Sequence, residues 1–579
     1  MIGKLGTLVL LAILAHGLSL SNGFVYDDHR FVDQNPALTG VTLRDAVLDA
    51  STHTSDLDRD VYRPLRLLGH AWDARQWGLD PFGFHVHSLL MHILNVILAF
   101  FVLRHLLDPG GTTPAMLGAG LLAVHPLGVE VVGWISSRGD LYALGFGLVA
   151  LGLATGWWKS RAALIAAGLA ACLATMAKES AAILPVVAWL HVRLLSPPTH
   201  SSDTSRHLRA GPWAMAAGVA VCFVLRQIAV SGASPVQTAP HGGSLLSQAA
   251  WALFGLSQTL GSLILPTGLS VEYPQDAWGA DALPIWIRPA TLIGLLVIAA
   301  PFALARRGHP RAAFLSAWAL LAYLPSSSLL VTLRELVNDR GAYPMLPAAG
   351  ALLGLACGRH RALAWCLLLG LGLPLALASS ARSTVFRSDK TLWTNVLVQH
   401  QDSVRAHLGL AQLAAEEPSQ RFHLARAVEN SRPGSKLQAI ALARFGEHLL
   451  QQAGGPPQAI PVLEQAWEAA IHWELRDRTA PNPRALAAAL AQALEEVGRS
   501  DEAEGVLTTA IDQAPEPTML LVKRAQIRLV RALRSGKASD VTALMESIED
   551  AERVAADHPL VQPLRELVRR RLGESALER

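Results

Sequence analysis

The sequence is poor in charge: Asp, Glu, Lys and Arg make up 16% of its 579 residues, whereas about 25% is typical of soluble globular proteins. Hydrophobic residues make up 51%, so we predict an integral membrane protein. The net charge of +3 is small and no basic run with interleaved aromatics occurs, which argues against a nucleic-acid partner. The four cysteines lie in apolar runs without metal-ligand spacing, which argues against a disulfide framework and a zinc site.

The low content of charged residues is a property of one part of the chain only. Apolar runs fill residues 1–380, whereas residues 381–579 are rich in charge. We therefore predict an all-α protein with a membrane helix bundle over 1–380, a linker over 381–400 and a soluble helical domain over 401–579. The first run has a poor signal-peptidase site and is expected to remain as a helix. The eleven predicted crossings are 5–20, 84–103, 115–132, 141–157, 162–177, 181–195, 213–230, 287–304, 312–331, 343–357 and 362–378.

Basic residues in the short loops orient this bundle. Eleven crossings place every short basic loop on the cytoplasmic side, as the positive-inside rule requires. A further apolar stretch, Leu246 to Leu265, would break this alternation and carries polar residues on one face, so we predict an interfacial or re-entrant helix. The loop that follows the first helix and the C-terminal domain are then both extracytoplasmic.

That first loop, residues 22–82, is too long for a simple turn and begins with the adjacent carboxylates Asp27 and Asp28. Long structureless loops are usually functional, and residues 66–77 have the apolar spacing of an interfacial helix. An isolated Asp-Asp pair more often caps a helix or solvates a loop. Its place at the end of a membrane helix favours chemistry on a lipid-borne substrate.

Four polar clusters interrupt the predicted outer helix ends, where charge is costly enough to indicate function. Carboxylates beside Arg and Lys suit transfer of a group activated by phosphate: a carboxylate takes a proton from the attacking hydroxyl, and the cations stabilise the departing phosphate. Simpler interpretations stay open, because Lys178 and Glu179 could form an interfacial ion pair and Arg138-Gly-Asp140 could cap a helix. The clusters are Asp27 with Asp28; His125 and Glu130 with Arg138 and Asp140; Lys178 with Glu179; and Arg334, Glu335, Asp339 and Arg340 with Tyr343.

Histidines on one predicted helix suggest a metal site, but the pattern is incomplete. His85 and His92 are seven residues apart on one face and have no matching carboxylate. Hydrogen bonding within the bundle is therefore favoured, and no metal is predicted.

The C-terminal region carries repeats. Leu490, Ala491, Leu494, Gly498, Ala503, Leu507, Ala510 and Pro515 have the spacing of a tetratricopeptide helix-turn-helix. A looser copy runs from Leu450 to Ala466, and a third is indicated from Leu408 to Ala427. We predict a fourth helix pair over 519–533 and 539–556 and a capping helix over 560–572.

A set of short motifs resembles one known family, the transmembrane and tetratricopeptide-repeat protein O-mannosyltransferases. The resemblance covers nearly the whole chain and depends on the order of the motifs and their place ahead of the repeats. The motifs are Phe24-Val-Tyr-Asp-Asp28, Tyr62-Arg-Pro-Leu65, Phe84-His85 with His92 and Asn95, His125-Pro126 with Glu130, Arg138-Gly-Asp140, Ala177-Lys-Glu179, Leu324-Pro-Ser326, Arg340 with Tyr343, and Leu392-Trp393.

The resemblance implies a GT-C glycosyltransferase fold and transfer of a sugar, usually mannose, from a polyprenyl phosphate to Ser or Thr hydroxyls of proteins, without a cofactor. It implies that Asp27 is the catalytic base and Asp28 its acidic neighbour. Mutation of Asp27 to Asn is expected to abolish transfer, and mutation of Asp28 to reduce it less. The implied donor-phosphate ligands are Arg138, Lys178, Arg340 and Tyr343, and the implied pocket-shaping residues are Arg63, His125, Glu130, Asp140 and Glu179.

The chain departs from this family at His87-Ser88, at Phe386 and in its short, degenerate repeats, so the acceptor stays open. Seven lysines stand against forty-two arginines, which suggests a bacterial relative in the inner membrane, with undecaprenyl phosphate as the donor lipid and a periplasmic active site. Two alternatives also remain. One is a ligase that moves an oligosaccharide from a pyrophosphate lipid, and the other is a transporter or scaffold whose repeats recruit partners.

Overall fold

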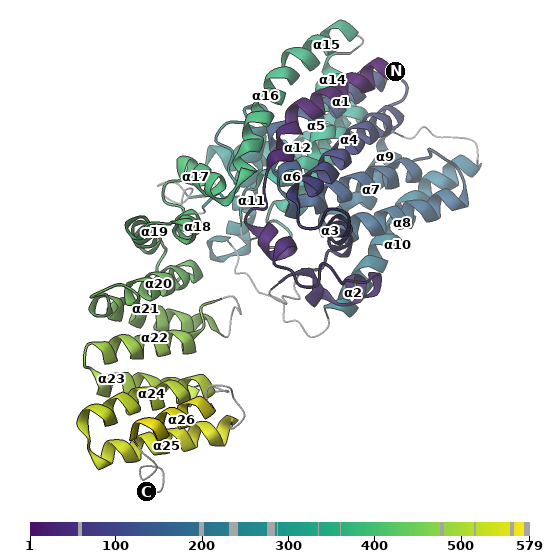
Figure 1. Cartoon of the computed structure of the whole chain (residues 1–579). Coiled ribbons are helices and arrows are strands. Elements are labelled where there is room, and N and C mark those ends of the chain that lie inside the picture. Colours follow the sequence, from purple (N-terminus) through teal and green to yellow (C-terminus); the bar gives the residue numbers. More distant parts are fainter. Residues whose placement is uncertain are drawn as a thin grey trace. The chain divides into compact units, whose positions relative to one another are not determined.

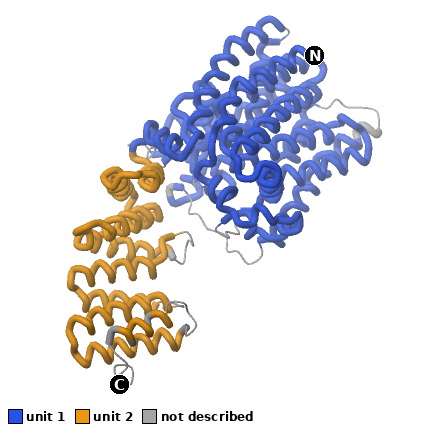
Figure 2. The backbone as a smooth tube through the Cα atoms, viewed as in Figure 1, with its two compact units in different colours: residues 1–401 blue, residues 402–579 orange. Residues whose placement is uncertain are grey.

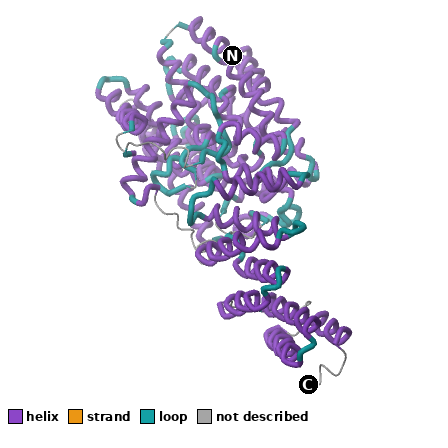
Figure 3. The backbone as a smooth tube through the Cα atoms, turned by 90° about the vertical axis from the view of Figure 1, so that its left-hand side faces the viewer, coloured by secondary structure: helices purple, strands orange, loops and turns teal. Residues whose placement is uncertain are grey.

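The computed structural model is built from helices and connecting loops (Figure 3). It describes residues 1–55, 61–195, 202–230, 241–274, 284–285, 288–333, 335–358, 360–474, 480–513, 517–555 and 561–572. No strand occurs in these ranges, so the predicted all-α class is confirmed. Asp56, Asp58, Asp60, Arg334, Arg359 and Pro515 lie outside the described residues.

The chain divides into two compact units, residues 1–401 and 402–579 (Figure 2). Residues 381–400, predicted as a linker, are helical and belong to the first unit. The longer helices of that unit (Figure 1) are α1 (Ile2–His16), α2 (Leu43–Leu48), α3 (Pro64–Trp77), α4 (Pro81–Leu106), α5 (Thr112–Val124), α6 (Val129–Gly133), α7 (Arg138–Ala154), α8 (Arg161–Ala177), α9 (Leu184–Leu195), α10 (Ser202–Ala229), α11 (Leu245–Ile264), α12 (Pro289–Arg306), α13 (Pro310–Tyr323), α14 (Leu346–Ala356), α15 (Arg361–Gly370), α16 (Gly372–Ser383) and α17 (Asp389–Gln399).

Short helical segments join these helices where the candidate site lies. The π-helical turn η2 (His29–Asp33) follows Asp27 and Asp28, and the other segments are 3₁₀ helices. They are η1 (Gly17–Ser21), η3 (Ala50–His53), η4 (Pro126–Gly128), η5 (Ile135–Ser137), η6 (Glu179–Ile183), η7 (His241–Gly243), η10 (Leu324–Ser326), η11 (Asp339–Met345) and η12 (Thr384–Arg387).

Small residues let the central helices approach closely. α5 packs against α14, and α8 packs against both α7 and α10. A Cβ atom added at Gly350 would lie 2.4 Å from the carbonyl oxygen of Leu117, so α14 and α5 are in contact backbone to backbone. Close packing of this kind is how membrane helices associate, because burial of apolar surface gives no driving force within lipid.

Five helical stretches are long and apolar enough to cross a membrane, and six if the bent pair 112–133 counts as one, within the residues described. This is fewer than the eleven crossings predicted. The difference comes from α7, α8, α9, α13 and α14, which have only 11 to 17 residues. At about 1.5 Å per residue none of them spans a hydrocarbon core of about 30 Å by itself. The prediction of an interfacial α11 stays a prediction, and α11 is not among the candidate spans.

The second unit consists of consecutive helix pairs. α18 packs on α19, α20 on α21, α22 on α23 and α24 on α25. The predicted repeat positions Leu490, Leu494, Ala503 and Leu507 are all buried in one core, and Gly498 has the positive φ (82°) that its turn requires. The helices are α18 (Val404–Leu413), α19 (Glu417–Glu429), α20 (Lys436–Leu450), α21 (Pro456–Glu474), α22 (Pro483–Glu496), α23 (Ser500–Gln513), α24 (Thr518–Ser535), α25 (Ala538–Ala555) and α26 (Val561–Leu572).

Candidate active site

Asp27 lies just after the first helix, in a loop that the backbone turns sharply. Tyr26 has a φ of 51°, a left-handed conformation that is uncommon for residues other than glycine. The Asp27 side chain is partly buried, and no hydrogen bond or ion pair to it occurs within the described residues. A carboxylate that has no partner in the resting structure is available to a ligand.

Asp28 is in a different environment. It is fully buried, and its carboxylate accepts hydrogen bonds from the Ser136 backbone N–H (2.7 Å), the Ser136 hydroxyl (2.5 Å) and the Val25 N–H (3.1 Å). Burial raises the pKa of Asp28 to about 7, although these hydrogen bonds act to lower it. Asp28 therefore anchors the loop to the segment before α7 and has no access to a substrate.

A second anchor holds the same loop to α17. The Asp389 carboxylate accepts a hydrogen bond from the Tyr26 N–H (2.7 Å) and contacts His29 Nε2 at 2.8 Å. The other ring nitrogen of His29 lies 2.8 Å from Asp33. Burial lowers the pKa of His29, but its bonds to Asp33 and Asp389 outweigh this effect and raise it above its ordinary value. We call Asp389, His29 and the Tyr26 N–H the Asp389 clamp.

This clamp is not visible in the sequence. In the sequence, Asp389 is an ordinary acidic residue in the first turn of a helix, and its partners lie some 360 positions earlier. Two backbone contacts support the same junction: the Gly23 N–H donates to the Arg387 carbonyl (3.1 Å) and Asn22 donates to the Ser383 carbonyl (3.0 Å).

Three cations, two of them from the predicted polar clusters, each pair with a carboxylate. Lys178 Nζ contacts both carboxylate oxygens of Asp140, at 2.6 and 2.7 Å. Arg340 donates to Glu130 at 3.1 Å, and Arg63 forms a two-pronged bond with Glu179, at 2.7 and 3.2 Å. The second carboxylate oxygen of Glu130 is buried and has no hydrogen-bond partner in the described part of the chain.

These three cations lie within electrostatic range of one another. Burial lowers the pKa of Lys178, Asp140 raises it, and the charges of Arg63 and Arg340 lower it again, leaving it below its ordinary value. Burial also acts to lower the pKa of Arg340, but nearby carboxylates outweigh this effect and raise it; Asp27 is among them. The fold thus brings Asp27 and the three cations, which we call the cation cluster, into one neighbourhood, a convergence typical of functional sites.

Arg340 also contacts aromatic groups. Its guanidinium carbon lies 5.0 Å from the centroid of the Trp134 ring, which is stacked on Tyr26 (5.7 Å). Tyr343 is one turn further along η11 and is fully buried, with its hydroxyl 3.0 Å from His92 Nδ1 and 3.4 Å from Asn95 Nδ2. The hydroxyl of Tyr343, which is predicted to bind the donor, is thus engaged within the bundle.

Two residues predicted for the site make hydrogen bonds that join segments of the bundle. Arg138 is fully buried; it pairs with the buried Asp73 and donates to the Phe84 carbonyl (2.7 Å) and to Ser88 (3.3 Å). Its guanidinium is thus occupied by these three partners, and its role as a donor-phosphate ligand stays a prediction. His125 caps η4 by accepting from the Leu127 N–H (3.2 Å), and its Nε2 lies 3.0 Å from the Leu263 carbonyl. Both residues orient helices around the site.

An apolar groove begins beside the cation cluster. Asp140 and Ser180 lie at its polar end, and the remaining lining is almost entirely apolar. Its walls come from α7, from η6 with α9, and from α13, with Leu144, Leu148, Leu184, Val187 and Trp318 among the lining residues. The ion pair of Lys178 with Asp140 thus lies at the end of an apolar groove.

No group of three or more His, Cys, Asp or Glu side chains that could hold a metal ion occurs among the described residues. Of the histidines considered for a metal site, His92 bonds to Tyr343 as above, and His85 is fully buried.

No protein-family model matches the chain. The chain is 32% identical over 142 residues to the protein O-mannosyl-transferase Tmtc1 of Drosophila melanogaster, which is 23% of this chain and 16% of that protein. It is 31% identical over 142 residues to mouse TMTC1 and 30% identical over 136 residues to human TMTC1, covering 14% and 15% of those proteins. The resemblance seen in the motifs is thus confirmed as similarity to these transferases, over a small part of their length.

The structure was also compared with solved structures. It matches the crystal structure of ArnT from Cupriavidus metallidurans bound to undecaprenyl phosphate over 89% of this chain and 81% of that one, with 13% identity and a TM-score of 0.34. A likeness at this score establishes neither a shared fold nor a shared ligand.

Proposed function

We propose that this chain is an inverting glycosyltransferase that moves a sugar, mannose in the first instance, from a polyprenyl-phosphate donor to a Ser or Thr hydroxyl of an acceptor protein. The observation that carries the proposal is the partly buried carboxylate of Asp27, which has no partner among the described residues and acts electrostatically on Arg340. Similarity to protein O-mannosyl-transferases supports the reaction type.

In the proposed reaction, the oxygen of the acceptor hydroxyl attacks the anomeric carbon, and Asp27 accepts the proton of that hydroxyl. The bond between that carbon and the phosphate oxygen breaks, and the polyprenyl phosphate leaves with the bonding electrons. Asp27 suits this role because it is partly exposed and unpartnered, whereas Asp28 is buried and held by three hydrogen bonds.

The cation cluster then stabilises the negative charge that builds on the departing phosphate. Arg63 and Arg340 offer several guanidinium donors. Lys178 is bonded to Asp140, which lines the polar end of the apolar groove. Their present partners, Glu179, Glu130 and Asp140, hold them in place until the donor binds. The groove is proposed to take the first isoprene units of the lipid.

The proposed site faces the periplasm of a bacterium, on the side opposite the short loops that carry basic residues. The low lysine content is consistent with a bacterial protein. The donor lipid of such a protein is proposed to be undecaprenyl phosphate.

The experiment that tests the proposal incubates the purified protein with labelled polyprenyl-phosphate mannose and a Ser/Thr peptide, and measures release of polyprenyl phosphate. We expect release by the wild type and a KM for the donor raised about tenfold or more in Arg340→Gln, because one charged hydrogen bond is worth about 1.5–3 kcal/mol. Arg161→Gln, a surface arginine at the start of α8, is the matched control. Turnover only with an oligosaccharide on a pyrophosphate lipid would identify a ligase, and no turnover with either would favour a transporter or scaffold.

A further inference from the structure

A second pocket lies at the opposite end of the first unit from Asp27. Near the end of α4, Arg104 lies 3.3 Å from the sulfur of Met1, where α1 begins, and His105 Nε2 lies 3.2 Å from the carbonyl of Thr155, just beyond the end of α7. Asp27 follows the other end of α1, and Asp140 lies in the first turn of α7. The pocket is therefore separated from the candidate active site by the length of these helices.

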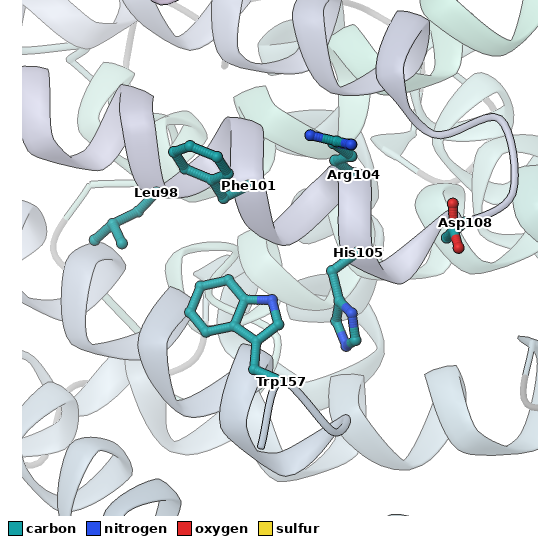
Figure 4. Close-up of a pocket in the computed structure, with 6 residues that line it drawn as sticks. All are labelled: Leu98, Phe101, Arg104, His105, Asp108 and Trp157. Atoms are coloured by element: carbon teal, nitrogen blue, oxygen red, sulfur yellow. The ribbon is translucent and has the colours of Figure 1, made fainter. Parts of the chain in front are cut away.

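The pocket has an apolar half and a polar half (Figure 4). Leu98, Phe101 and Trp157 line the apolar half, and Arg104, His105 and Asp108 line the polar half. Its volume is about 490 Å³. Apolar groups lie toward the middle of α4 and charges at its end, as at a boundary between hydrocarbon and water.

The two charged side chains of the pocket are not paired. Arg104 and Asp108 are both exposed, and neither forms an ion pair with any residue in the described part of the chain. They also do not pair with each other, although they are four positions apart. One cation and one anion therefore face the same pocket, and each keeps its capacity to bind an opposite charge.

His105 adds a hydrogen-bond acceptor to the polar half of the pocket, beside the carboxylate of Asp108. If its Nε2 donates to the Thr155 carbonyl, as the 3.2 Å contact indicates, the neutral ring leaves Nδ1 as an acceptor. The polar half then offers guanidinium donors from Arg104 and acceptors from Asp108 and His105. This pattern matches a ligand that carries a phosphate and an ammonium group close together.

The surroundings indicate that this ligand is a lipid. Trp157 lies in the pocket and its neighbour Trp158 is 68% exposed; Lys159 and Arg161 follow in the chain. Tryptophan with adjacent basic residues is typical of the interface between membrane and water, and pockets between helices at that level bind phospholipid headgroups.

We propose that this pocket binds phosphatidylethanolamine, with the phosphate at Arg104, the ammonium at Asp108 and His105, and an acyl chain against Leu98, Phe101 and Trp157. The site is separate from the proposed donor site and does not depend on the proposed function. Phosphatidylglycerol has the phosphate but no ammonium, so Asp108 disfavours it. Phosphatidylcholine has no N–H to donate to Asp108 or His105.

The proposal is tested by reconstituting the full chain in nanodiscs with equal amounts of phosphatidylethanolamine, phosphatidylglycerol and phosphatidylcholine of identical acyl chains. The lipids that remain bound after transfer to mild detergent are then counted by native mass spectrometry. We expect the wild type to retain phosphatidylethanolamine in about tenfold excess over the other two, the effect of roughly one charged contact. Arg104→Gln should no longer retain any of the three lipids. Asp108→Asn should no longer prefer phosphatidylethanolamine and should retain more phosphatidylglycerol than the wild type.

Arg161→Gln is the matched control, because it removes the same charge at the same membrane surface but outside the pocket. Thermal unfolding of each variant excludes loss of fold as the cause. The proposal is overturned if the wild type prefers phosphatidylglycerol or retains the three lipids equally. It is also overturned if Asp108→Asn keeps the wild-type preference, or if Arg161→Gln matches Arg104→Gln.

Discussion

Asp27 and Asp28 are neighbours in the chain with opposite environments. Asp27 is partly exposed and has no partner among the described residues, whereas Asp28 is buried and accepts three hydrogen bonds. A general base needs access to the proton that it removes, so in the proposed mechanism Asp27 reacts and Asp28 holds the loop.

Mutation of Asp27 to Asn should lower kcat by a factor of about 100 or more, because Asn keeps the size of the side chain but cannot take a proton. The measurement is release of polyprenyl phosphate in the assay above. Asp80→Asn is the control: Asp80 caps α4 through the Phe82 N–H, and Asn caps equally well. Full activity of Asp27→Asn would contradict the proposed mechanism.

Asp28 should make stability depend on pH in a defined direction. Its pKa of about 7 in the fold exceeds the value of about 3.9 in an unfolded chain, so the folded state holds the proton more tightly. Its contribution to stability is greatest below pH 4 and is lost as the pH rises to about 7. The Tm of the wild type should therefore fall relative to that of Asp28→Asn across this interval. A difference in Tm that does not change with pH would contradict the assignment.

Substitutions of Arg138 and Arg63 should have different effects, the first on stability and the second on donor binding. Arg138→Gln leaves the carboxylate of Asp73 buried without its cation and should reduce the free energy of unfolding by about 3–5 kcal/mol. Arg63→Gln should leave Tm nearly unchanged, because Glu179 is 55% exposed, but should raise the KM for the donor. Thermal unfolding and donor titration of both variants test this. A normal Tm with a raised KM for the donor in Arg138→Gln would instead indicate that Arg138 binds the donor phosphate.

At the scale of elements, the site is assembled from helix ends. α7 supplies Asp140 in its first turn, Lys178 and Glu179 follow α8, and Arg340 lies in η11 just before α14. The helices that bear these groups are shorter than a full membrane span, and α7 is buried by its neighbours along nearly its whole length.

The helix α17 acts on the site through the Asp389 clamp. Asp389→Asn weakens the bond to His29 and should lower kcat about tenfold with little change in the KM for the donor, because it loosens the loop that carries Asp27 and leaves the cation cluster intact. The pKa of His29 is raised by Asp33 and Asp389 against the effect of burial, so the clamp is strongest at low pH and weakens as the pH rises through that pKa.

The kcat of the wild type should therefore decline toward high pH, and the Asp389→Asn variant should decline at a lower pH. Asp402→Asn, which removes an 82% exposed carboxylate, is the control. Identical pH profiles for the wild type and Asp389→Asn would show that the clamp does not position the loop.

At the scale of the molecule, the boundary between the units defines two informative truncations. The first unit ends at Gln401 and includes α17, so a chain ending there should still consume the lipid donor with a short peptide. We propose that the repeats bind the acceptor protein, so the same chain should lose transfer to that protein.

A chain ending at Ser388 lacks both Asp389 and Trp393, whose ring contacts Tyr26 at 5.0 Å, and should lose activity toward both acceptors. The two truncations are compared in the same assay with peptide and protein acceptors. Undiminished transfer to the protein by the chain ending at Gln401 would contradict an acceptor role for the repeats. Full activity of the shorter chain would contradict the clamp.

The sequence alone determined the properties that depend on local composition. Its apolar runs gave the membrane character, and the small residues at repeat spacing gave the helix pairs of the second unit, where Leu490, Leu494, Ala503 and Leu507 are buried as predicted. The sequence also picked out Asp27, because a carboxylate at the end of a membrane helix is costly.

Only the tertiary structure separated Asp27 from Asp28, placed Arg138 with Asp73 and joined Asp389 to His29 and Tyr26. Each of these results depends on which partner a polar side chain meets, and the partners lie 65 positions apart for Arg138 and Asp73 and 360 positions apart for His29 and Asp389. A charge in a sequence shows that a partner is needed, because burying it alone is too costly. The folded chain decides which residue that partner is.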